Sequence, residues 1–121
     1  MIKTFKDLDA WREGHKLVIE IYKITKEFPK DELFGLVNQM RRCAVSITSN
    51  IAEGFSRNSF KEKVQFYYMS LGSTSELQNQ LTIAKDVNYI SQSTFEILEN
   101  QTITTHKIIN GLIRSSRSHY S

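Results

Sequence analysis

The sequence is poor in residues that break regular structure or cross-link the chain. Its 121 residues include one proline and five glycines, which favours long helices over many short strands. A single cysteine, Cys43, excludes a disulfide within the chain and is typical of a reducing compartment. No apolar run approaches the ~18 residues of a membrane span, and the N-terminus lacks a signal-peptide pattern. We therefore expect a cytoplasmic protein that does not enter the membrane.

Motifs of known enzymes are also missing. The sequence has no G-x-S-x-G, Walker A or H-E-x-x-H pattern. None of His15, His106 and His119 has a glutamate three positions before it, which excludes the Glu-x-x-His pairs of di-metal bundles. We interpret Cys43 as a packing residue and His15 as a core or boundary histidine. We expect no enzyme activity, no cofactor and no metal.

The composition is that of an ordinary soluble domain. The chain is 40% hydrophobic and 24% charged, and its length suits one hydrophobic core, so we expect a single domain over 1–121. The formal net charge of +3 is compatible with a polyanionic partner but does not require one.

Hydrophobic periodicity predicts an all-α protein with four amphipathic helices. The predicted helices span 7–28, 32–53, 60–89 and 94–116. The apolar stripe of the first helix is predicted to be Leu8, Trp11, His15, Val18, Tyr22 and Thr25. Because the connections are short, the helices should form an antiparallel up-down-up-down bundle.

Residues typical of helix ends support these boundaries. Pro29 should end the first helix, and Asp31 is a suitable N-cap for the second. Gly54 is expected to end the second helix as its C′ residue. Ser-x-x-Glu capping boxes at 59–62 and 93–96 should open the last two helices.

The stretch 39–54 carries two stripes on one predicted helix. The apolar stripe is Leu36, Val37, Met40, Ala44, Ile47 and Ile51. The polar stripe, at the same spacings, is Gln39, Arg42, Ser46, Asn50 and Glu53. A surface helix needs only the first stripe, so the second indicates a further buried or half-buried contact.

The third helix offers partners for the polar stripe. Antiparallel pairing sets Ser46 near Ser70, Arg42 near Ser73 and Gln39 near Glu76. The sequence therefore predicts a polar layer that includes Ser73 and Glu76, with an Arg42–Glu76 ion pair as its strongest link. This layer could fix packing within or between subunits, or it could line a surface for a ligand or nucleic acid.

Basic residues gather at two places in the sequence. Arg41, Arg57, Lys61 and Lys63 flank the end of the second helix and the start of the third, where they could contact phosphate. Arg114, Arg117 and His119 form a second cluster on the tail. Either cluster could equally be solvated charge.

Several of these residues match a known pattern. The matches in the central stretch are Gln39, Arg41, Arg42, Ala44, Ser46, Ile47, Asn50, Ile51, Glu53 and Gly54. Together with Phe28-Pro29, Gly72-Ser73 and Glu76-Leu77, they resemble the signature of the four-helix proteins of the 23S rRNA intervening-sequence (S23) family. Cys43 and Thr48 depart from the small residue and the proline expected at those positions.

The resemblance implies a left-handed four-helix bundle that assembles as a homopentamer. Some members of the family are encoded within insertions in 23S rRNA genes. A related branch, the accessory proteins of diversity-generating retroelements, forms basic pentameric barrels that bind nucleic acid and reverse transcriptase. For most members of the family the function is unknown.

The resulting hypothesis is a non-enzymatic oligomeric bundle that binds structured RNA or another nucleic acid. The residues assigned to phosphate contact are Arg41, Arg42, Arg57, Lys61 and Lys63. The alternative is a protein–protein scaffold or adaptor ring that has no role with nucleic acid.

Overall fold

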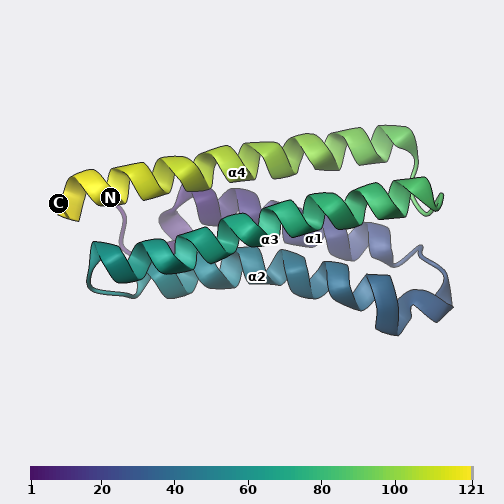
Figure 1. Cartoon of the computed structure of the whole chain (residues 1–121), viewed down its shortest axis with the longest axis horizontal. Helices are drawn as coiled ribbons and strands as arrows, with labels where there is room; N and C mark the ends of the chain where they lie inside the picture. The colour runs from purple at the N-terminus through teal and green to yellow at the C-terminus, as the bar shows by residue number, and fades with distance from the viewer. Residues whose placement is uncertain (121) are drawn as a thin grey trace.

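The computed structural model describes residues 1–120, with side chains described through Arg117. This part of the chain contains four α-helices and no strand. The helices are α1 (Asp9–Thr25), α2 (Asn38–Phe55), α3 (Phe60–Asp86) and α4 (Gln92–Tyr120). They run up, down, up and down, each beside the next, and α4 packs back against α1 (Figure 1). The predicted all-α bundle is confirmed.

The connections fall at the two ends of the bundle. The N-terminal segment, the α2–α3 connection and the last turns of α4 share one end (Figure 1). The α1–α2 and α3–α4 connections share the other end. No helix in the described chain is both long and apolar enough to cross a membrane.

The core forms where the buried faces of the four helices meet. Met40, Ala44, Ile47 and Ile51 of α2 are fully buried, which confirms the predicted stripe at these positions. On α4 the buried side chains are Phe95, Leu98, Thr102, Thr105, Ile109, Ile113 and Ser116.

The predicted stripe of α1 is displaced by about a quarter turn: Leu8 and Thr25 are buried as predicted, but His15 and Tyr22 are exposed. The buried residues are Ala10, Gly14, Leu17, Ile21 and Thr25. His15 is exposed and stacks on Trp11 with ring centroids 4.7 Å apart, so it is not a core histidine. Gly14 faces α2 so closely that a Cβ would lie 3.0 Å from Cγ2 of Thr48. Two of the buried positions, Ala10 and Gly14, are thus small residues, whereas the hydrophobic pattern had favoured larger side chains.

The α1–α2 connection is not the simple turn that the sequence suggested. A 3₁₀ turn (Lys30–Glu32) and a π-helical turn (Leu33–Val37) precede α2, so the predicted start at residue 32 and the Asp31 cap are wrong. Gly35 leaves the helical conformation, with φ −109° and ψ −114°. A carboxylate oxygen of Glu32 accepts the Leu36 N–H at 3.2 Å and so takes the capping role.

Glu32 also ties this connection to the α3–α4 turn. The phenol of Tyr89 donates to Oε2 of Glu32 at 2.8 Å, and its ring packs on Phe28 with centroids 5.2 Å apart. The bond from Tyr89, followed by that from Leu36, lowers the pKa of Glu32. The same hydrogen bond raises the pKa of Tyr89.

The α2–α3 connection differs from prediction at Gly54. α2 continues to Phe55, and Gly54 is buried beneath Tyr67, where a Cβ would lie 2.6 Å from Cε1 of that ring. Gly54 therefore permits close packing instead of ending the helix. Ser59 caps α3 as predicted, accepting the Glu62 N–H at 3.2 Å.

The α3–α4 turn is built on Asn88, whose φ of 67° is left-handed. The N–H groups of Asn88 and Tyr89 bond back to the carbonyls of Lys85 and Ala84, a Schellman ending that closes α3 three residues before the predicted position 89. Ser91, not Ser93, caps α4, because its Oγ accepts the Thr94 N–H at 3.1 Å.

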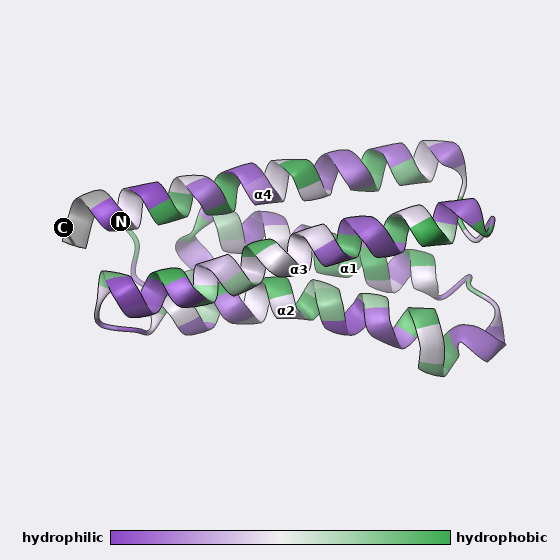
Figure 2. Cartoon of the chain, viewed as in Figure 1, coloured by the Kyte–Doolittle hydropathy of each residue, from purple (hydrophilic) through white to green (hydrophobic). Residues whose placement is uncertain are grey.

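Apolar residues lie among polar ones along α3 (Figure 2), and several of the apolar residues are exposed to solvent. Tyr68, Met69, Ile83 and Val87 are each between 42% and 56% exposed. Gly72 lies among them, and a Cβ built there would meet nothing within 4 Å. We call these five residues the outer face of α3.

Candidate nucleic-acid interface

The polar layer between α2 and α3 has a hydrogen-bonded centre. The hydroxyls of Ser46 and Ser73 lie 2.9 Å apart. The side-chain amide of Asn50 donates to the carbonyl and to the hydroxyl of Ser46, at 2.9 and 3.0 Å. The two helices approach at this level as predicted, but Ser46 bonds to Ser73, one turn from the Ser70 that the sequence set opposite it. Half-buried Ser46, Asn50 and Ser73 thus serve packing within one chain.

The outer members of the predicted layer behave differently. Gln39, Arg42 and Glu76 line an open hollow of about 320 Å³ between α2 and α3, and all three are exposed. Arg42 and Glu76 form no ion pair in the described part of the chain, so the prediction of that pair is wrong. An exposed pair gains little over solvation, and Glu76 accepts a 3.4 Å bond from Gln80 instead.

Glu53 and Cys43 complete this stretch of α2. Glu53 pairs with Arg57 at 3.2 Å and does not join the layer. Cys43 is buried, and its Sγ donates to the carbonyl of Ser73 at 3.1 Å. Burial, followed by the charge of Glu76, raises the pKa of Cys43 to about 12. A thiol held in this protonated form is a poor nucleophile, in keeping with its interpretation as a packing residue.

Lys63 is not a surface cation. Its side chain is only 6% exposed, and its Nζ donates to the carbonyls of Phe55 and Gly54 at 2.7 and 3.4 Å. The ammonium thus neutralises the C-terminal end of α2, and burial lowers the pKa of Lys63. The assignment of Lys63 to phosphate contact does not fit this position.

Arg41 lies apart from the basic residues with which the sequence grouped it. Almost four turns of α2, about 21 Å, separate it from the end of that helix, just beyond which Arg57 lies. Its Nε donates to the hydroxyl of Thr25 at 2.9 Å, and its guanidinium lies 4.7 Å from the ring centre of Tyr22. Arg41 therefore belongs with the α1–α2 face, whereas Arg42 lies where this face meets the α2–α3 hollow.

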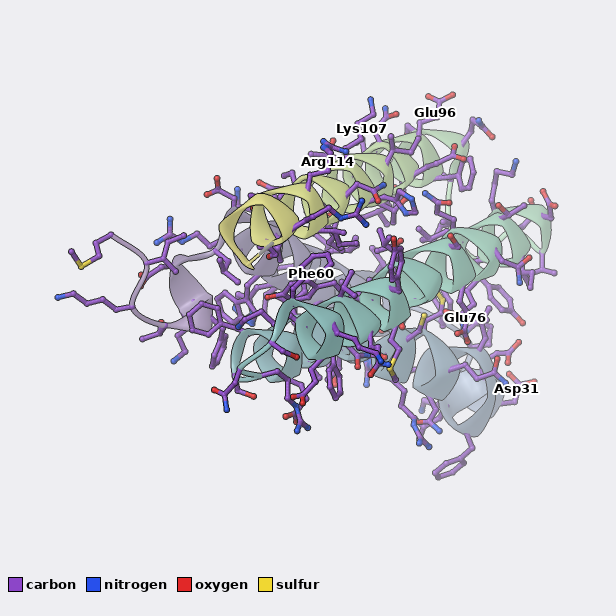
Figure 3. The ribbon with its side chains drawn as sticks, turned by 60° about the vertical axis from the view of Figure 1, so that its left-hand side comes forward. Asp31, Phe60, Glu76, Glu96, Lys107 and Arg114 are labelled. Carbon is purple, nitrogen blue, oxygen red and sulfur yellow. The ribbon has the colours of Figure 1, made fainter. Side chains whose placement is uncertain are left out.

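The other end of the bundle joins two clusters that are separate in sequence. Arg57, Lys61, Arg114 and Arg117 are exposed. The guanidinium of Arg117 lies 5.5 Å from the ring centre of Phe60, which brings the end of α4 beside the start of α3. Figure 3 shows Arg114 and Phe60 toward this end, and Glu76 and Asp31 toward the opposite one. The side chain of His119 lies outside the described residues.

Several buried polar contacts were missed in the sequence. Ser70 donates to the carbonyl of Ile47 at 2.8 Å. Between α3 and α4, Thr74 bonds to Nδ1 of His106 at 2.9 Å, and the amide of Gln78 donates to Thr102 at 3.0 Å. Hydroxyl residues within the apolar stripes were the available signal. No cluster of three or more His, Cys, Asp or Glu side chains that could hold a metal forms within the described chain.

Comparison with known proteins places this arrangement in a family. The model of the 23S rRNA-intervening sequence protein family matches residues 6–111. The chain belongs to this family. The match includes the contacts that join α2 to α3, Ser46 with Ser73 and Gly54 with Tyr67.

A solved structure of the S23 ribosomal protein family supports the fold. It is a protein of unknown function from Bacteroides thetaiotaomicron, 19% identical, with a TM-score of 0.80. The alignment covers 87% of this chain and 95% of the other. At this identity the likeness concerns the fold alone. A comparison with curated proteins gives no match.

Proposed function

We propose that this S23-family protein is a non-enzymatic, cytoplasmic, oligomeric bundle that binds structured RNA or another nucleic acid through phosphate contacts. The observation that carries the proposal is the basic end formed by Arg57, Lys61, Arg114 and Arg117. Phosphate contacts of this kind position a nucleic acid without reading its sequence. Arg42, exposed on α2, adds a further cation.

The contacts of the basic end do not prevent phosphate binding. Arg57 is paired with Glu53 on the surface, and such pairs are worth at most about 1 kcal/mol. Its guanidinium also lies 4.8 Å from the ring centre of Phe66, which orients it. A phosphate can therefore replace the carboxylate at small cost.

The family name, which refers to an intervening sequence in 23S rRNA, supports RNA as the partner. The resemblance to the accessory proteins of diversity-generating retroelements extends the same proposal to other nucleic acids.

We propose self-association through the outer face of α3, with a homopentamer as the expected state. Exposed Tyr68, Met69, Ile83 and Val87 give this face apolar area, and Gly72 lets another backbone approach. Light scattering after gel filtration tests the assembly. Met69→Glu should shift the mass toward the monomer, whereas a wild-type monomer at micromolar concentration would contradict the proposal.

A scaffold without a role in nucleic-acid binding is the second candidate. Phe34 in the α1–α2 connection is 91% exposed, beside half-exposed Leu33. Aromatic side chains of this kind are frequent anchors of protein–protein contacts. This candidate predicts partner binding that Phe34→Ser abolishes and that substitutions at the basic end leave intact.

The salt dependence of RNA binding distinguishes the nucleic-acid-binding function from the scaffold function. We expect fluorescence anisotropy with a structured RNA hairpin to show affinity falling at least tenfold between ~50 and ~200 mM salt. Arg57→Gln with Lys61→Gln should weaken binding and flatten this dependence. The matched control, Lys16→Gln with Lys23→Gln, removes two exposed charges from α1. Equal losses in both pairs, or no binding at low salt, would contradict the proposal.

A further inference from the structure

An open hollow of about 500 Å³ lies between α1 and α2 and adjoins the α2–α3 hollow, with which it shares Asn38, Arg42 and Ser46. This volume is within the ~300–1,000 Å³ usual for small-ligand sites. Tyr22 and Val45 supply its apolar surface, while Asn38, Arg41, Arg42 and Ser49 supply polar groups. Two arginines and no carboxylate line it, so the hollow favours an anionic ligand.

Arg41 and Tyr22 form a fixed stacked pair at this hollow. The Nε and Nη2 groups of Arg41 donate to the Thr25 hydroxyl at 2.9 Å and the Tyr22 carbonyl at 3.5 Å. These bonds hold the guanidinium 4.7 Å from the ring centre of Tyr22. The Tyr22 residue remains 40% exposed. Aromatic rings and guanidinium planes are the platforms on which unpaired bases stack.

The remaining polar groups suit the rest of a nucleotide. Arg42, one residue on, is exposed and forms no ion pair in the described chain, so it can meet a phosphate. The amide of Asn38, one turn before Arg42 on α2, can donate to and accept from the edge of a base.

We infer that the α1–α2 hollow holds an unpaired nucleotide of a single-stranded nucleic acid. Its base stacks on the Tyr22–Arg41 pair, and its phosphate lies at Arg42. A base within a duplex is already stacked and paired, so it cannot enter the hollow. This inference rests on the proposed nucleic-acid function and adds selection for unpaired nucleotides at a site distant from Arg57 and Lys61.

The test compares a labelled, unstructured 12-nucleotide RNA with the same strand annealed to its complement, using anisotropy. Tyr22→Ala should weaken single-strand binding roughly 5- to 150-fold, the range of one lost base–aromatic stack. Duplex binding should change less than about twofold. Tyr22→Phe keeps the ring and should bind like wild type. Ile97→Ala is the control, since Ile97 is an exposed apolar residue of α4 that lies outside the hollow, the basic end and the outer face of α3.

Thermal melting of each variant separates loss of binding from loss of fold. If wild type binds neither RNA, the proposed function fails. If wild type binds with salt dependence but Tyr22→Ala matches Ile97→Ala, only the hollow is excluded. Equal weakening of single strand and duplex by Tyr22→Ala would also overturn the inference, because the ring would then not select unpaired bases.

Discussion

The phenol of Tyr89 donates a 2.8 Å hydrogen bond to Glu32, joining the two connections at one end of the bundle. The pKa of Glu32 is lowered in the folded protein, so the carboxylate contributes stability above its unfolded pKa and loses it as pH falls through the folded value. The pKa of Tyr89 is raised, so its contribution is lost as pH rises through the folded value.

Tyr89→Phe should therefore lower the melting temperature most near neutral pH. The difference from wild type should shrink in strong acid, where Glu32 is protonated in both proteins, and in strong base, where Tyr89 of the wild type ionises. Calorimetry across pH measures this, with Tyr68→Phe as a control on an exposed phenol. A constant difference at all pH values would show that the bond does not carry the effect.

Gly54 and Gly72 should respond oppositely to alanine. Gly54→Ala places a Cβ 2.6 Å from Tyr67 and should destabilise the fold by about 1–3 kcal/mol. Gly72→Ala meets nothing within 4 Å and should stabilise the monomer by up to about 1 kcal/mol through helix propensity. Urea unfolding measures both. If Gly54→Ala were neutral, the close packing on Tyr67 would not limit this position.

Gln80 is a buried polar residue whose removal should not cost stability. Its Oε1 is buried without a hydrogen-bond partner in the described chain, and its amide makes only a 3.4 Å contact with Glu76. Gln80→Leu should leave the free energy of unfolding unchanged or raise it by about 1 kcal/mol. Ser70→Ala, which removes a made 2.8 Å bond, should lower it by about 1 kcal/mol. A clear loss in Gln80→Leu would point to a partner for that oxygen.

Substitutions of Lys61 and Lys63, which lie close together on α3, should have different effects on RNA affinity and on stability. Lys63→Gln removes the cation that caps α2 and should lower the melting temperature, with RNA affinity little changed. Lys61→Gln removes an exposed charge and should do the reverse. Melting curves and anisotropy on the same samples give both readouts. A larger binding loss in Lys63→Gln at equal folding would restore Lys63 to the interface.

Periodicity was sufficient where large apolar residues set the contact. The stripe of α2 and its approach to Ser73 followed from spacing, because Met40, Ile47 and Ile51 are both apolar and buried. The stripe of α1 did not, because Ala10 and Gly14 reach the core through being small.

The candidate site was harder to predict, because it depends on the direction of each side chain in the folded structure. Lys61 and Lys63 carry the same charge, and the sequence does not distinguish them. In the structure, only the side chain of Lys63 turns back to the carbonyls at the end of α2. The sequence grouped Arg41 with Arg57, but the two residues lie near opposite ends of α2. The contact of Arg117 with Phe60 joins segments more than fifty residues apart, which no local pattern shows.

The α2–α3 connection consists of only four residues, 56–59. Closing so short a loop costs little chain entropy, and the two helices then make the most extensive helix contact in the bundle. We expect this hairpin to form first during folding, with α1 and α4 docking onto it. The backbone amides at the centre of this hairpin, around Ser46 and Ser73, should then be the last to exchange with deuterium. The segment that resembles the family signature would in that case be the part of the molecule that opens most slowly.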